Sequence, residues 1–191
     1  MQLEQIREEV KHILSEKRYK HSLGVEKRAA ELGAIYGVDI EKAKLAGITH
    51  DIAKEMTKEE IFAYAQENGI QLSPIEREIP KVLHGKIGAD ICKKKYGFDE
   101  ELQKAIAYHT TGAPDMDTLA KIIYLADITE ENRTFDDLPK IKSLSETNLE
   151  EAMLYALNRE LVSKIKEDKL IHPATLETRN EILLLFNTFF K

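Results

Sequence analysis

The sequence of 191 residues has little of several features that mark particular classes of protein. It has one cysteine, Cys92, so an intramolecular disulfide is excluded and a reducing compartment is expected. No apolar run reaches the about 18 residues that a transmembrane helix needs, and the polar first residues do not resemble a signal peptide. A net charge of −6 argues against nucleic acid or an anionic membrane as a partner, because binding either needs a basic face. We therefore expect a cytoplasmic protein with neither partner.

What the sequence does contain is apolar residues at helical spacing. Almost every segment repeats with a period near 3.6 residues, and few show the alternation typical of strands. Two capping boxes, Thr57-Lys58-Glu59-Glu60 and Ser73-Pro74-Ile75-Glu76, predict helix starts, and Gly37 and Gly97 predict helix ends. Residues 129–146 are polar and irregular, so a long loop is expected there.

The pattern as a whole predicts an all-α fold of roughly eight to ten helices in a single domain. That domain is expected to span residues 1–191, with a motif-bearing core at about residues 18–133. The helices expected within residues 147–191 would pack on this core.

Polar residues of the metal-binding type stand at the ends of these apolar helical segments. Four of the six histidines and two aspartates do so: His21, His50, Asp51, His84, His109 and Asp127. Helical periodicity places His50 on the face of Ala46, and His109 on the face of Ile106, so these side chains point inward. An unpaired buried polar atom costs about 1–3 kcal/mol. Each residue could be satisfied separately, but a shared metal centre satisfies all of them, and imidazole with carboxylate suits iron, manganese or zinc.

The remaining candidates have simpler explanations. Cys92 lies beside Ile91 in an apolar pattern, which indicates a packed thiol rather than a nucleophile. His12 is expected on the surface of the first helix, and His172 lies in a loop before Pro173.

The stretches around the six residues are similar to those of a known family. Their order resembles the HD-domain metal-dependent phosphohydrolases. The short sequence motifs that contain these residues resemble those of the YqeK family. Members of that family are bacterial symmetrical bis(5′-nucleosyl)-tetraphosphatases, which split diadenosine tetraphosphate into two ADP. These motifs are Arg18-Tyr19-Lys20-His21-Ser22, His50-Asp51-Ile52-Ala53-Lys54, Leu83-His84-Gly85, His109-Thr110-Thr111-Gly112 and Ala126-Asp127.

The resemblance spans about residues 18–133, and a weaker similarity is found in His172-Pro173-Ala174-Thr175 and in Arg179-Asn180. One departure stands out. The family usually has a proline between a glutamate and an arginine that align with Glu130 and Arg133, and Glu131 lies there instead. The change leaves the expected ligands alone and bears on the conformation of the loop.

The resemblance implies an HD-type fold and a metal-dependent hydrolase, a bis(5′-nucleosyl)-tetraphosphatase. It implies that one divalent metal is held by His21, His50, Asp51 and Asp127, with iron expected and manganese or another metal as alternatives. His84 and His109 would either complete a second metal site, with Asp51 bridging, or bind a phosphate. The implied catalytic residues are Asp51 and Lys54, with Lys54 expected one turn beyond Asp51 on the same helix.

The implied substrate is a small-molecule nucleotide. Arg18 precedes His21 by three residues, which places both on one helical face, and the guanidinium of Arg133 suits phosphate oxygens. The substrate-binding residues implied by the resemblance are Arg18, His21, Lys54, His84, His109, Thr110, Thr111, Gly112, Arg133, Leu170, Ile171, His172, Pro173, Thr175 and Asn180.

Three other hypotheses remain beside this one. The first is an HD enzyme with another substrate, such as a deoxynucleotide or cyclic-nucleotide phosphohydrolase or a di-iron oxygenase. The second is a nucleotide or metal sensor that binds without turnover, and its ligands would look the same in sequence. The third is a purely structural helical protein with buried histidines. The sequence leaves the oligomeric state open.

Overall fold

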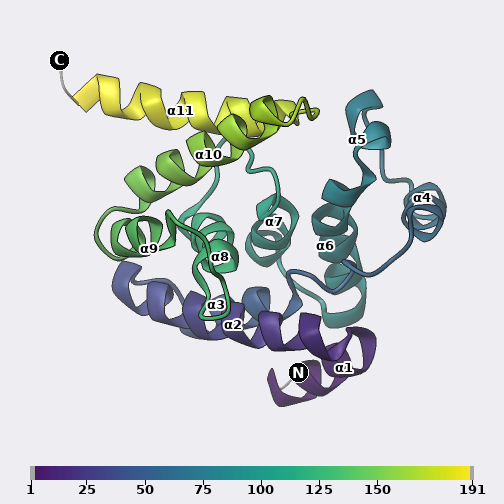
Figure 1. Cartoon of the computed structure of the whole chain (residues 1–191). Coiled ribbons are helices and arrows are strands. Elements are labelled where there is room, and N and C mark those ends of the chain that lie inside the picture. The colour runs from purple at the N-terminus through teal and green to yellow at the C-terminus, as the bar shows by residue number, and fades with distance from the viewer. Residues whose placement is uncertain (1–2, 190–191) are drawn as a thin grey trace.

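The computed structural model describes residues 3–189, and within them the secondary structure is entirely helical (Figure 1). The predicted all-α class is confirmed. In chain order the elements are α1 (Leu3–Ile13), α2 (Glu16–Tyr36), α3 (Ile40–Thr49), α4 (Lys58–Glu67), α5 (Pro74–Glu78), the 3-10 helix η1 (Pro80–Val82), α6 (Leu83–Tyr96), α7 (Glu100–Tyr108), α8 (Thr118–Thr129), α9 (Leu138–Thr147), α10 (Leu149–Lys166) and α11 (Pro173–Phe189).

The long loop expected over residues 129–146 is wrong for its second half, which forms α9. Ile141 is fully buried and Leu144 is half-buried, three residues apart on one face of this helix. The apolar stripe is short and lies among polar residues, so its tertiary burial rather than its composition stabilises the helix. With α9 and the five-residue α5, the described residues contain eleven α-helices, one more than the upper end of the expected range.

Local signals set the predicted helix ends. Thr57 and Ser73 each accept a hydrogen bond from the backbone three residues on and form both halves of a capping box. Gly37 and Gly97 end α2 and α6 in the left-handed region, with φ of 71° and 70°. These four predictions are confirmed.

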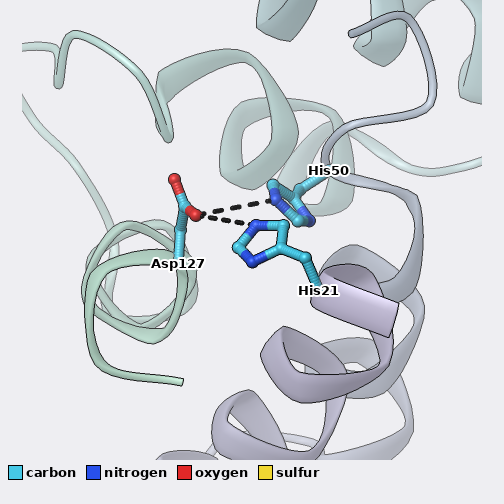
Figure 2. A group of neighbouring side chains, drawn as sticks. All are labelled: His21, His50 and Asp127. Atoms are coloured by element: carbon cyan, nitrogen blue, oxygen red, sulfur yellow. Dashed lines mark ion pairs between the residues drawn. The ribbon is translucent and has the colours of Figure 1, made fainter. Parts of the chain in front are cut away.

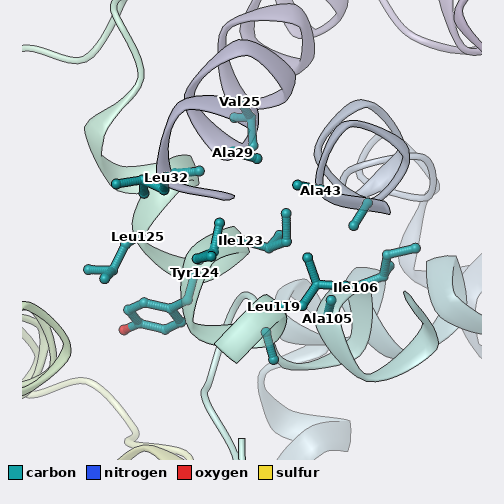
Figure 3. Close-up of a cluster of buried hydrophobic side chains, with 14 of the residues drawn as sticks. Val25, Ala29, Leu32, Ala43, Ala105, Ile106, Leu119, Ile123, Tyr124 and Leu125 are labelled. Atoms are coloured by element: carbon teal, nitrogen blue, oxygen red, sulfur yellow. The ribbon is translucent and has the colours of Figure 1, made fainter. Parts of the chain in front are cut away.

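The core is built around α8, which contacts α2, α3, α7, α9 and α10 (Figure 1). Its apolar residues are almost completely removed from water, and Leu119, Ile123 and Leu125 lie among side chains from the surrounding helices (Figure 3). Each such side chain contributes about 1.5–3 kcal/mol to folding. One main cluster runs from Ile6 of α1 to Ile182 of α11, and the single-domain organisation stays a prediction.

Two glycines let the helices that carry site residues approach closely. A Cβ at Gly47 of α3 would lie 2.7 Å from the Cα of Glu26 on α2. A Cβ at Gly85 of α6 would lie 2.8 Å from the carbonyl oxygen of Ala107 on α7. Real Cβ atoms do not approach backbone this closely, so these contacts require glycine. The pairs α2–α3 and α6–α7 therefore bring their polar ends together on one side of the core.

Candidate metal centre and active site

All six predicted ligand-type residues meet at one place. His21 lies on α2, His84 on the first turn of α6 and Asp127 on the last turn of α8. His50 and His109 are the residues at which α3 and α7 end, and Asp51 follows His50. His21, His50 and Asp127 point toward one another from three segments (Figure 2). The four histidines and Asp51 are buried, and Asp127 is 20% exposed.

The carboxylate of Asp51 lies at the middle of the cluster. Its Oδ1 is 2.9 Å from Nε2 of His84 and 3.5 Å from Nε2 of His109. Its Oδ2 is 3.4 Å from Nε2 of His50 and 3.8 Å from Nε2 of His21. Asp127 closes the opposite side, with Oδ1 3.0 Å from Nε2 of His21. Asp51 therefore faces one pair of histidines with each oxygen.

Two overlapping groups of these residues have ligand atoms within 4.8 Å of one another: His21 with His50 and Asp127, and His50 with Asp51 and His109. Either group has the nitrogen and oxygen donors that suit a divalent transition metal. His50 belongs to both groups and Asp51 to one of them, and whether one or two ions bind stays a prediction.

The hydrogen bonds of the rings aim the same nitrogen of each histidine at the centre. In His50, His84 and His109, Nδ1 lies 2.6–2.7 Å from the carbonyl oxygen of the residue three positions earlier. A carbonyl can only accept, so Nδ1 donates and the neutral ring keeps an unprotonated Nε2. His21 is held through Nδ1 by the carboxylate of Glu130, at 3.0 Å. Metal-binding histidines are held in this way by carbonyls and carboxylates.

Several polar atoms at the centre lack a hydrogen-bond partner among the described residues. They are Nε2 of His21, Nε2 of His50 and Oδ1 of Asp51, all buried. Nε2 of His84 also faces Nε2 of His109 at 3.0 Å, which sets two lone pairs against each other. An unsatisfied buried polar atom costs about 1–3 kcal/mol, and a bound cation removes this cost for all of them. The donor set therefore fits a metal ion.

The charges of the centre favour a cation. Burial raises the pKa of Asp51, but the surrounding histidines outweigh it and hold the pKa well below its usual range. Burial also raises the pKa of Asp127, but the imidazole of His21, whose Nε2 lies 3.0 Å from Oδ1, and nearby positive charges lower it further than burial raises it. Burial lowers the pKa of His84 to about 4. At neutral pH the centre thus presents two carboxylates and a neutral His84.

Three predicted cations surround these carboxylates. Arg18 donates to Oδ2 of Asp51 at 2.8 Å, and Lys54 donates to Nε2 of His84 at 3.1 Å. Arg133 pairs with the carboxylate of Asp127 and donates through Nε to its carbonyl at 2.8 Å. All three therefore contact residues of the centre, and their binding of phosphate stays a prediction.

The expected helical position of Lys54 is wrong. Helix α3 ends at Thr49, and residues 50–55 form consecutive turns. The backbone N–H of Lys54 bonds to the carbonyl of Asp51 at 2.8 Å, three residues back instead of four. This tighter turn still directs the ammonium group to the centre, 3.7 Å from Oδ1 of Asp51.

Glu130 was not among the candidates from the sequence. It is 2% exposed, and its Oε2 accepts from the backbone N–H of Asn132 at 2.7 Å while Oε1 contacts His21. A Cβ at Gly24 would lie 2.4 Å from Oε2, so the glycine leaves room for the carboxylate. A carboxylate three residues after Asp127, at the end of a strongly apolar helix, was the signal that could have found it.

Glu131, at the departure from the family pattern, lies on the surface and pairs with Lys27 at 2.6 Å. The substitution thus adds a surface ion pair while Glu130 and Arg133 on either side keep their contacts with His21 and Asp127. Surface pairs of this kind contribute little to stability.

The remaining predicted substrate-binding residues mostly line one cavity of about 520 Å³. We call it the Thr110 cavity, lined by Thr110, Thr111, Leu170, Ile171, His172 and Thr175. Gly112 ends the turn beside it with φ +69°, and Thr178 packs against the glycine. Pro173 is exposed at the start of α11, and Asn180 is exposed on that helix and bonds to Arg179. The structure does not place Pro173 or Asn180 in the lining of this cavity.

No helix within the described residues is both long and apolar enough to cross a membrane.

The chain has close relatives among known proteins. Residues 18–132 match the sequence signature of the HD domain. A symmetrical bis(5′-nucleosyl)-tetraphosphatase from Halalkalibacterium halodurans is 38% identical over 176 residues, covering 92% of this chain and 94% of that protein. One from Bacillus subtilis is 36% identical over 172 residues, covering 90% and 92%.

Similarity extends to a solved fold. The crystal structure of a predicted HD superfamily hydrolase involved in NAD metabolism from Clostridium acetobutylicum matches with a TM-score of 0.93 at 36% identity. The match covers 96% of this chain and 97% of that one. With a matching domain signature, full-length relatives and a shared fold, the chain belongs to the HD-domain family and, within it, to the symmetrical bis(5′-nucleosyl)-tetraphosphatases.

Proposed function

We propose that the protein hydrolyses diadenosine tetraphosphate, and similar dinucleoside polyphosphates, symmetrically to two nucleoside diphosphates. The observation that carries this proposal is the buried centre around Asp51, whose unpaired ligand atoms lie beside Arg18, Lys54 and Arg133. Ligands for a metal and cations for phosphate, side by side, suit a phosphoanhydride hydrolase. The relatives that cover nearly the whole chain have the same activity in their names.

The proposed metal ligands are His21, His50, Asp51 and Asp127, with His84 and His109 holding a second ion or a phosphate. Iron is the expected metal, with manganese as the first alternative. When bound, such an ion lowers the pKa of water and neutralises negative charge on phosphate. The hydrogen bonds that Nδ1 donates orient the rings before any ligand arrives, so little reorganisation is needed on binding.

In the proposed reaction, water attacks the phosphorus of one central phosphate. The bond from that phosphorus to the bridging oxygen breaks, and the oxygen leaves with the other half of the molecule as ADP. Lys54 and Arg18, which already contact Asp51, would hold the oxygens of the attacked phosphate. Arg133 would bind phosphate oxygens bidentately and neutralise charge as the leaving group departs. The Thr110 cavity would receive one nucleoside.

The test is incubation of the metal-loaded protein with diadenosine tetraphosphate, with products separated by ion-exchange chromatography. ADP as the sole product is expected, and Asp51→Asn is expected to abolish turnover while the helical circular dichroism stays unchanged. Repeating the assay with iron, manganese and zinc identifies the metal that supports turnover. AMP with ATP as products, or full activity of metal-free Asp51→Asn, would contradict the proposal. The cytoplasmic location and the absence of nucleic-acid and membrane partners stay predictions.

A further inference from the structure

The proposed substrate has two nucleosides, and the Thr110 cavity accounts for one of them. Symmetrical cleavage breaks the middle phosphoanhydride bond, so the two halves of the substrate extend to different sides of the centre. The second half needs another hollow that borders the centre, carries positive charge for phosphate and offers apolar surface for a base. This requirement rests on the proposed function.

One cavity has all three properties. It has a volume of about 560 Å³, and we call it the Met56 cavity, lined by Arg18, Lys54, Met56, Lys58, Ile61 and His84. Arg18, Lys54 and His84 connect it directly to Asp51. Its size is within the range of about 300–1,000 Å³ that is usual for small-molecule sites.

The charge of the Met56 cavity is predominantly positive. Lys58 and Lys81 line it in addition to Arg18 and Lys54, and its carboxylate is that of Glu55. Both oxygens of Glu55 accept hydrogen bonds from Ser15, at 2.6 Å each, so this carboxylate already has partners of its own. A substrate with about four negative charges at neutral pH would be attracted here, although the protein as a whole carries −6.

Apolar side chains complete the lining. They are Met56, in the loop before α4, Ile61 of α4 and Pro80 of η1. Pro80 and Lys81 line both the Met56 cavity and the Thr110 cavity, so η1 is the wall between the two. Two nucleosides in these cavities would lie on opposite sides of η1, with the phosphates between them near His84.

A rival hollow of about 470 Å³ borders the centre on its other side, lined by Ser15, Lys17, Lys20, His21, Asn132 and Arg133 among others. We call it the Lys17 cavity. Every side chain in its lining is polar or charged, and Glu55 and Glu130 are among them. It can hold phosphate or water, but unlike the Met56 cavity it offers a base no wholly apolar side chain.

We propose that the Met56 cavity binds the second nucleoside of the dinucleotide, with its base against Met56 and Pro80 and its phosphates near Lys54 and Lys58. The Lys17 cavity then takes no part in binding the nucleoside. This assignment gives each ADP half its own cavity.

Two matched substitutions test the assignment. Lys58 and Lys17 are both exposed and both stand in the first turn of their helices, α4 and α2. Lys58→Glu and Lys17→Glu therefore change the net charge equally and place the new carboxylate at a favourable helix N-terminus. Lys58→Glu is expected to raise the KM for diadenosine tetraphosphate about tenfold with kcat changed less than twofold. The reason is that the lost interaction stabilises the bound substrate and the transition state equally. Lys17→Glu is expected to change KM less than twofold.

Met56→Ala tests the base contact separately. Adenosine 5′-tetraphosphate has the same phosphate chain with one nucleoside, and its inhibition constant is expected to stay within twofold of wild type. The KM for diadenosine tetraphosphate is expected to rise several-fold in the same variant. Equal effects on both nucleotides, or equal effects of Lys58→Glu and Lys17→Glu, would overturn the assignment.

Calorimetry with ADP gives a readout without turnover. The metal-loaded wild-type protein is expected to bind two ADP per chain, and Lys58→Glu is expected to weaken one of the two sites about tenfold. A single ADP per chain in the wild type would overturn the second site. A wild type that binds two ADP yet yields no ADP from diadenosine tetraphosphate would refute the proposed reaction and leave both nucleotide sites standing.

Discussion

Replacing Gly47 by alanine should separate the two helices that carry His21 and His50. The added Cβ would lie 2.7 Å from Cα of Glu26 and 3.0 Å from its backbone nitrogen. Carbon atoms normally meet at about 3.5–4.0 Å, so α2 and α3 must move apart by close to 1 Å. Overpacking of this kind costs about 1–3 kcal/mol, against a gain of at most about 1 kcal/mol in helix propensity. We expect a net loss of about 1–2 kcal/mol.

The chain contains a matched control for this substitution. Gly33 lies on α2 in the same interface, but its Cβ would meet the side-chain methyl of Ala43 at 3.3 Å instead of backbone. Gly33→Ala has the same gain in helix propensity and a smaller overlap, so we expect stability within about 0.5 kcal/mol of wild type.

Urea unfolding followed by circular dichroism measures both variants. With a slope of about 2 kcal/mol per molar urea, Gly47→Ala should lower the midpoint by about 0.5–1 M. Its metal affinity, measured by competition with a chromophoric chelator, should also fall, because the ligand atoms of His21 and His50 move apart. If Gly47→Ala were as stable as Gly33→Ala and bound metal as tightly, close backbone contact would not be what positions these two histidines.

Two further predictions concern the ligands of the centre. Glu130→Ala removes the acceptor that orients His21 and should weaken metal binding at least tenfold in the same competition assay. The control is Glu131→Ala, which loses only a surface ion pair, and equal metal affinities of the two variants would argue against a positioning role for Glu130. In metal-free protein, the pKa of His84 is lowered from 6.5 to about 4, so the unfolded chain takes up a proton between these values that the folded chain does not. Stability to urea should therefore be greatest above pH 6.5 and fall by up to about 3 kcal/mol toward pH 4. The lowered pKa values of Asp51 and Asp127 reduce stability further only below the unfolded pKa of 3.8. Stability that stays constant or rises on acidification would contradict the neutral, buried state of His84.

Helix boundaries and candidate ligands could be predicted because their signals are local. Thr57 and Ser73 cap their helices through residues three positions away, and Gly37 and Gly97 end theirs through their own φ. The inward direction of the histidines and aspartates could also be predicted from local sequence. The helical period shows which apolar residues lie on the same helix face as each of them. The resemblance to a known family then ordered them into one site.

The features that sequence reasoning missed depend on contacts between distant segments. Glu130 meets His21 across 109 positions of the chain, and no local pattern encodes that contact. Ile141 becomes buried only when α9 packs against α8 and α10, so its segment looked like a loop. Lys54 lies outside α3, which ends at Thr49, and no local signal for this helix end was recognised in the sequence.

The amino-acid pattern thus determined the helical class, the helix ends at Gly37, Thr57, Ser73 and Gly97, and the identity of the six ligand-type residues, because these follow from periodicity and from short-range hydrogen bonds. The tertiary structure decided how these residues face one another. Close approach at Gly47 and Gly85 sets the distances between their helices, and the packing of α4, η1 and α11 shapes the cavities beside the centre. Such distances are sums over many packed side chains, and no short stretch of sequence contains them.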